Sequence, residues 1–138
     1  MSISLTAVQV PFVITETNHL IISISINSIR ARLLVDTGAS ASCLSYEMVK
    51  KLSISTSKFT LPMSSANALI EEPMQTDELL IQTQHWKKHA KFIVIDLKTI
   101  NDSLHPYIDK PIDGILGTDV LHQSKAVIDF RSNTIKLF

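Results

Sequence analysis

Asp36 and the small residues after it are the part of this sequence best suited to chemistry. Three apolar residues, 33–35, lead directly into this carboxylate. An unbroken apolar run is typical of a strand buried on both faces, and a carboxylate at its end is costly to bury unless neighbouring groups hold it. We expect Thr37 to offer a hydroxyl and Gly38 to adopt a backbone angle that other residues avoid. Ala39 and Ser40 would keep the turn around the acid narrow.

Two segments carry a resemblance to a known family. Val35-Asp36-Thr37-Gly38-Ala39-Ser40 resembles the active-site loop of the aspartic proteases, which is Asp-Thr-Gly followed by Ala or Ser. The segment 112–121 resembles the family's second element, in which two apolar residues and a glycine open a short helix; here these are Ile115, Leu116 and Gly117. The order and separation are similar to those of small retroviral-type (retropepsin-like) proteases, particularly the stand-alone bacterial-type members. We expect Ile115, Leu116 and Gly117 to pack under the active-site loop.

The sequence supplies one Asp-Thr-Gly, which is half of a catalytic pair. Acid-catalysed peptide hydrolysis uses two carboxylates that share one proton: one activates the attacking water, and the other protonates the substrate carbonyl. The prediction is therefore an aspartic endopeptidase that acts as a homodimer, with Asp36 of each subunit meeting its twin on a two-fold axis. The resemblance implies that Thr37 ties the two loops together across this axis and that Gly38 lies against the substrate backbone. The expected partners are a second copy and a peptide or protein substrate, without cofactor or metal.

The resemblance also implies a flap, a hairpin that closes over the substrate. By position it falls within 63–75, with a tip at Ser65, Ala66 and Asn67. Such tips are usually rich in glycine, and this one contains none. A non-catalytic peptide-binding module on the same fold therefore remains an alternative.

Other reactive residues favour structural interpretations. Asp113-Gly114 predicts a turn, and Asp119 falls in the first turn of an expected short helix, where its charge complements the helix dipole. His85 and His89 have a spacing that could hold a metal on a helix, but the residues between them indicate a solvated basic loop, so no metal site is expected. We expect Trp86 to be a surface or interface anchor, and Cys43 to be a small hydrophobe.

The spacing of apolar residues and turns predicts an all-β fold in a single domain, 1–138. Residues 20–26 alternate strictly, Asn27-Ser28 predicts a hairpin turn, and 29–35 form the returning strand. Further short strands are expected at 41–44, 58–62, 79–81, 92–95, 115–116, 126–130 and 134–138, and we expect 79–81 to pair with 92–95. Short helices are expected at 46–52 and 118–122, and 98–111 reads as irregular. This pattern is typical of a barrel or sandwich, and the resemblance implies a retropepsin-like closed barrel or sandwich of short strands with one or two short helices.

Charge and composition exclude several functions. Thirteen basic and thirteen acidic side chains give a formal net charge of zero, so no nucleic-acid footprint or polybasic membrane anchor is expected. The single cysteine cannot form an internal disulfide. The first residues contain no basic region followed by a long apolar run, so we expect no signal peptide or membrane span and a cytoplasmic location.

Overall fold

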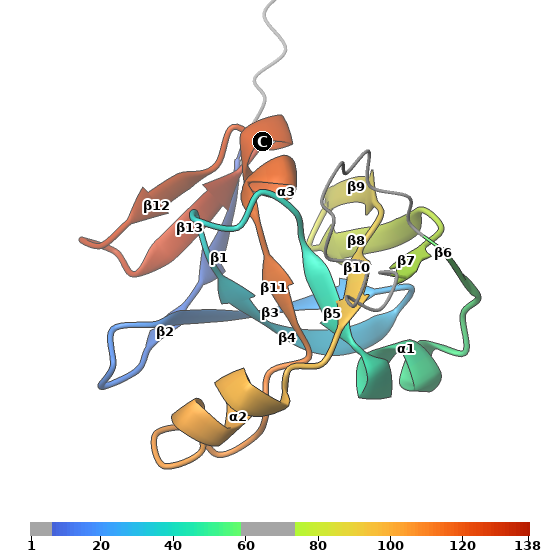
Figure 1. The fold of residues 1–138 in the computed structure, drawn as a ribbon. Helices are drawn as coiled ribbons and strands as arrows, with labels where there is room; N and C mark the ends of the chain where they lie inside the picture. Colours follow the sequence, from blue (N-terminus) through green and yellow to red (C-terminus); the bar gives the residue numbers. More distant parts are fainter. Residues whose placement is uncertain (1–6, 59–73) are drawn as a thin grey trace, which may run out of the picture.

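The computed structural model describes residues 7–58 and 74–138, which form a mainly β protein with short helices (Figure 1). The smaller sheet has the order β1 (Val8–Pro11), β13 (Thr134–Leu137), β12 (Val127–Asp129). The larger sheet has the order β6 (Thr56–Lys58), β7 (Met74–Thr76), β10 (Ile93–Ile95), β5 (Cys43–Ser45), β11 (Gly114–Leu116), β4 (Ile29–Val35), β3 (Leu20–Ile26), β8 (Leu79–Thr83), β9 (Trp86–Ala90), with β2 (Val13–Ile14) paired to β3. The helices are α1 (Tyr46–Leu52), α2 (Lys98–Leu104) and α3 (Thr118–Gln123). Within the described residues, no helix has the length and apolar character needed to span a membrane.

The β3–β4 hairpin is the longest strand pairing, and it was predicted correctly. Its register runs from Leu20 opposite Val35 to Ile26 opposite Ile29. Asn27 and Ser28 have φ values of 46° and 69°, the left-handed geometry that lets a two-residue turn follow the natural twist of the strands. The hairpin thus delivers the chain to Asp36 along a fixed path.

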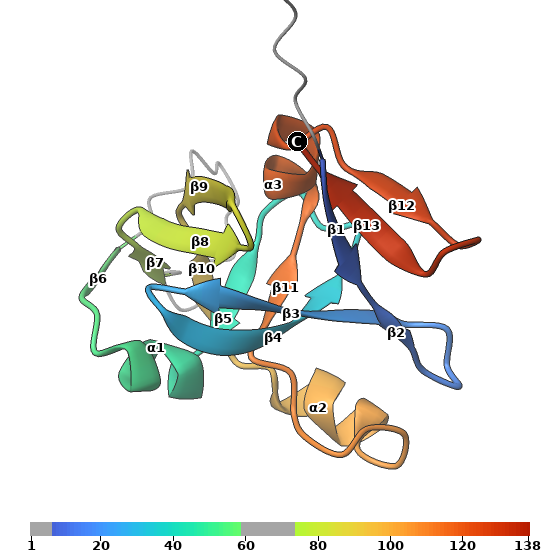
Figure 2. The same cartoon turned by 180° about the vertical axis from the view of Figure 1, so that it is seen from behind.

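Strand β11, which belongs to the second segment that carries the resemblance, lies next to β4, which leads into the first. It pairs parallel to β4, with Ile115 opposite Leu34 and Leu116 opposite Val35, and antiparallel to β5. Figures 1 and 2 show β11 running between α2 at one end and α3 at the other. Gly114 permits this close packing, because a Cβ there would collide with the carbonyl oxygen of Cys43. The second segment therefore lies directly beside the strand that ends at Asp36.

Two apolar clusters hold these elements together. The larger joins both sheets and includes Ile24, Leu33, Leu116 and Ile135, each at most 1% exposed. The smaller lies under α2 and consists of Ile21, Leu34, Leu97, Leu104, Ile112 and Ile115. Because Leu34 and Ile115 lie side by side on the β4–β11 pair, α2 packs against the strands that carry the site.

Three sequence expectations differ from the structure. The stretch 98–111 is not irregular throughout, since α2 occupies its first half. The strand at 79–81 does not pair with that at 92–95: β8 pairs with β9, and β10 pairs with β5 and β7. Trp86 is not a surface anchor but 5% exposed, with Nε1 donating to the carbonyl oxygen of Phe138 at 3.2 Å. Of the strand expected at 58–62, only Lys58 lies in the described residues, at the end of β6.

Candidate active site

Asp36 directly follows β4 and is half-buried. Its backbone N–H donates to the carbonyl oxygen of Leu116 at 3.0 Å, which extends the parallel pairing of β4 with β11 by one residue. Its Oδ1 accepts a hydrogen bond from the backbone N–H of Gly38 at 2.8 Å. Among residues 7–58 and 74–138, no donor contacts Oδ2. One carboxylate oxygen is thus fixed by the loop.

The expected role of Gly38 needs correction. None of the glycines has a positive φ, so Gly38 does not supply an unusual backbone angle. It supplies space instead, because a Cβ at this position would lie 3.1 Å from Oδ1 of Asp36. The missing side chain lets the amide of Gly38 approach the carboxylate closely enough to donate.

The first turn of α3 holds the active-site loop through hydrogen bonds. The carbonyl oxygen of Ala39 accepts from Thr118 N at 2.8 Å and from Thr118 Oγ1 at 3.1 Å. A Cβ on Gly117 would lie 2.7 Å from that same oxygen. Thr37 and Ser40 of this loop are exposed. The role of Thr37 across a dimer axis stays a prediction.

Ser42 connects the two segments, a structural role that the sequence alone does not indicate. It is fully buried; its Oγ donates to Asp119 Oδ1 at 2.7 Å and accepts from Gly117 N at 2.9 Å. The carboxylate of Asp119 also accepts from Ser42 N at 3.0 Å and from Val120 N at 2.9 Å. Asp119 therefore organises the backbone at the start of α3.

Asp113 is also structural, although it does not form the expected turn. Its Oδ2 accepts from the backbone N–H of Arg32 at 2.8 Å, and its own N–H donates to the carbonyl oxygen of Arg32 at 2.7 Å. These bonds continue the β4–β11 pairing to the residue before Gly114. Of the three carboxylates in the two segments, only that of Asp36 lines the open groove beside Leu34 and Val35.

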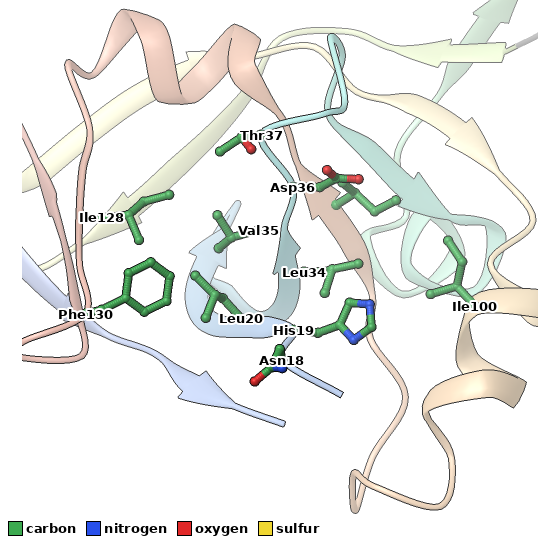
Figure 3. A pocket seen from close by; sticks show the side chains of 11 residues that line it. Asn18, His19, Leu20, Leu34, Val35, Asp36, Thr37, Ile100, Ile128 and Phe130 are labelled. Carbon is green, nitrogen blue, oxygen red and sulfur yellow. The ribbon is translucent and has the colours of Figure 1, made fainter. Parts of the chain in front are cut away.

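An open groove of about 660 Å³ surrounds Asp36 (Figure 3). Thr37 and two polar residues, Asn18 and His19, contribute to its lining. The remaining lining residues are apolar: Leu20, Leu34, Val35, Ile100, Ile115, Ile128 and Phe130. Figure 3 shows Ile128 and Phe130 on one side and Ile100 on the other, with Asp36 and Leu34 between them. The groove is thus mostly apolar, and the carboxylate of Asp36 lies on its wall.

His19 was not predicted as a groove residue, although the register of the predicted hairpin indicates its position. The turn at Asn27-Ser28 fixes the hairpin register, and continuing it one step beyond Leu20 and Val35 places His19 opposite Asp36. Ile100, Ile128 and Phe130 had no such signal, because they come from elements distant in the chain. The flap residues Ser65, Ala66 and Asn67 lie outside the described residues.

The surroundings of Cys43 agree with its interpretation as a small hydrophobe. Burial raises the pKa of the thiol, and the nearby charges of Asp119 and Asp36 raise that pKa further. The side chain packs against the cluster under α2. A thiol with a raised pKa stays protonated and is a poor nucleophile.

The two histidines considered as metal ligands do not lie on a helix. His85 is in the turn before β9, and His89 is on that strand. Within the part of the chain that the structure describes, no group of three or more His, Cys, Asp or Glu side chains could hold a metal ion.

Residues 22–120 match a family model described as aspartyl protease. No curated protein matches the sequence. Similar solved structures include a retropepsin-like aspartic protease from Rickettsia conorii, at 20% identity and a TM-score of 0.58, covering 95% of this chain and 89% of that chain.

Two further structures are similar. The retroviral protease-like domain of Ddi1 from Leishmania major shares 17% identity at a TM-score of 0.57, with 86% of this chain and 87% of that chain covered. The EIAV protease, solved with the inhibitor HBY-793, shares 19% identity at a TM-score of 0.53, with 94% and 100% covered. At these identities the likeness is one of fold, which is retropepsin-like.

Proposed function

The chain belongs to the aspartyl protease family, and from this premise we propose that it is an endopeptidase that works as a homodimer. Asp36 from each of two copies would form the catalytic pair. The observation that carries the proposal is the environment of Asp36: its Oδ1 is held by Gly38, and its carboxylate lies in an open, mostly apolar groove. Asp113 and Asp119 are engaged by backbone donors, so neither competes for this role.

The need for a second copy follows from the chemistry of the pair. Two carboxylates within hydrogen-bond distance cannot both ionise, so they share a proton. One then removes a proton from the attacking water while the other donates to the substrate carbonyl. Among the described residues, no second acid lines the groove beside Asp36. A two-fold dimer supplies it without any further sequence element.

The surface beside Asp36 is suited to an apolar contact with that second copy. Phe130 is 63% exposed although it lines the groove, and Val13 of the neighbouring β2 is 67% exposed. The ring of Phe130 packs edge-on against Phe12, with centroids 5.6 Å apart, so the ring is supported from within the chain. A contiguous exposed apolar patch favours a protein contact, and Phe130 and Val13 would contribute to such a patch in the proposed dimer.

The proposal is tested with the purified chain and a diverse peptide library, from acid to neutral pH, with and without a statine-type transition-state analogue. We expect cleavage that the analogue inhibits and that Asp36→Asn reduces to background. Asp77→Asn is the matched control, because it makes the same change on an exposed carboxylate between β7 and β8. Its activity should equal that of the original chain.

Three results would refute this function. Cleavage that persists in Asp36→Asn, or that the analogue does not affect, would exclude the proposed pair. Peptide binding without cleavage at any pH would instead support the non-catalytic module. Sedimentation velocity should show that Asp36→Asn still forms a folded dimer. The loss of cleavage can then be assigned to the missing carboxylate and not to a loss of assembly.

A further inference from the structure

Helix α2 places its apolar side chains in two different environments. Leu97, directly before the helix, and Leu104, at its end, are 1% and 2% exposed in the cluster that includes Leu34 and Ile115. Ile100 lies on the same side, packs against this cluster and is only half-buried. Its remaining surface lines the groove that contains Asp36. Ile100 is therefore the point at which α2 reaches the candidate active site.

Side-chain hydrogen bonds fix the helix in this position. The Oδ1 of Asn101 accepts from the backbone N–H of Ile112 at 2.8 Å, and its Nδ2 donates to the carbonyl oxygen of Ile112 at 3.2 Å. Ile112 lies just before β11 and is 1% exposed. At the start of the helix, Asp96 Oδ1 accepts from Lys98 N at 2.9 Å. Because Asn101 follows Ile100 directly, these two hydrogen bonds anchor α2 next to the residue that faces the groove.

The wall that Ile100 completes is aliphatic. Ile100, Leu34 and Ile115 line one part of the groove, and Figure 3 shows Ile100 and Phe130 on opposite sides of Leu34 and Asp36. A peptide extended past Asp36 presents its side chains alternately to the two sides of its backbone. A side chain next to the bond being cut would then contact this wall, and the size of Ile100 would limit the space available to it.

We propose that Ile100 is a specificity-determining residue: held by α2 beside Asp36, it sets the largest apolar side chain that a peptide substrate can place next to the scissile bond. The inference rests on the function proposed above and adds to it the chemical class of the preferred residue. A two-fold dimer contains two copies of Ile100. We therefore expect the same limit at two positions of the peptide, one on each side of the scissile bond.

The test compares cleavage of matched peptides by four forms of the full chain: the original, Ile100→Ala, Ile100→Phe and Thr99→Ala. The peptides differ only by Ala, Val, Leu or Phe at each position flanking the scissile bond, and kcat/KM is measured for each. Thr99→Ala is the control, because Thr99 is an exposed residue of α2 outside the groove lining. We expect the ratio of kcat/KM for Phe over Val to rise about 10-fold in Ile100→Ala, since a pocket discriminates by roughly 10- to 200-fold per methylene-scale change.

Ile100→Phe should lower the same ratio, and Thr99→Ala should leave it unchanged. If Ile100→Phe does not fold by circular dichroism, Ile100→Val provides a second variant, with a rise in the ratio of a few-fold. The inference is overturned if the original chain cleaves peptides and all Ile100 variants retain its side-chain preference. If the original chain cleaves no peptide, the proposed function fails, and the specificity role of Ile100 fails with it.

Discussion

Gly38 controls how the carboxylate of Asp36 is held. Its φ is not positive, so alanine can adopt the same backbone conformation. A Cβ would nevertheless lie 3.1 Å from Asp36 Oδ1 and push the carboxylate by a few tenths of an ångström. Because catalytic groups lose about 100-fold in rate when misplaced by about 1 Å, we expect Gly38→Ala to reduce kcat/KM by roughly 10- to 100-fold. The free energy of unfolding should change by less than about 1 kcal/mol.

Gly114→Ala is the matched control for this prediction. Its Cβ would meet the backbone oxygen of Cys43 and lie 2.9 Å from a side-chain carbon of Leu44, so the strands must move apart. Such overpacking costs about 1–3 kcal/mol. Urea unfolding and peptide cleavage, measured for both variants, should separate an effect on chemistry from an effect on packing. Equal losses of stability in the two variants would contradict the role given to Gly38.

The sequence was informative about Asp36 because local rules govern its surroundings. An apolar run predicts the buried strand β4, and Asn27-Ser28 predicts the turn that sets its register. Ser42 illustrates the limit of such rules. Its bonds to Gly117 and Asp119 span more than seventy residues, and nothing in its own neighbourhood distinguishes it from the exposed Ser40.

Among the elements, α2 depends on Asn101 for its attachment to β11. Asn101→Ala would leave the buried N–H of Ile112 without its acceptor, and an unpaired buried donor costs about 1–3 kcal/mol. We expect a loss of that size in the free energy of urea unfolding. Asp102→Ala is the control, since it removes only the exposed pair with Lys98 and should leave the free energy of unfolding nearly unchanged. Equal costs would show that Asn101 does not anchor the helix.

Two elements, α2 and β9, were predicted incorrectly because tertiary contacts determine their structure. Helix α2 is seven residues long, too short to form without support, and its stability comes from Leu97, Leu104 and the bonds of Asn101. Strand β9 carries Lys87, Lys88 and His89 because it lies at one end of the sheet order, where charged residues discourage further pairing. A short run of charged residues such as this one is also typical of a solvated loop. Only the pairing with β8 shows that these residues form a strand.

For the whole molecule, two exposed carboxyls with lowered pKa values, Asp109 and Asp129, predict a loss of stability in acid. The Arg32 guanidinium bonded to Asp109 lowers the pKa of that carboxyl, and the backbone N–H of Arg131 lowers the pKa of Asp129. A lowered folded-state pKa adds stability above the unfolded pKa of about 3.9, and this stability is lost as the pH falls through the folded value. The urea midpoint should therefore decrease below a pH of about 4.

The variant Asp109→Asn with Asp129→Asn should show a smaller decrease over the same acid range, although its midpoint at neutral pH should be lower. An unchanged acid slope would exclude these two carboxylates as contributors. At the alkaline end, hydrogen bonding to Asp102 raises the pKa of Lys98. The stability that this pair adds is complete below the ordinary value of 10.5 and is lost as the pH rises through the raised value.

Assembly of two copies provides the most direct test at this scale. If the surface around Asp36 forms the dimer, Phe130→Glu places a charge in an apolar contact and should shift the monomer–dimer equilibrium by at least about 10-fold towards monomer in sedimentation velocity. In the proposed mechanism the catalytic pair needs both copies, so activity per molecule should then fall further on dilution than in the original chain. Tyr107→Glu is the control, since Tyr107 is similarly exposed, at 46%, but lies outside the groove lining. A dimer that tolerates Phe130→Glu, or activity independent of concentration in a proven monomer, would place the second carboxylate elsewhere.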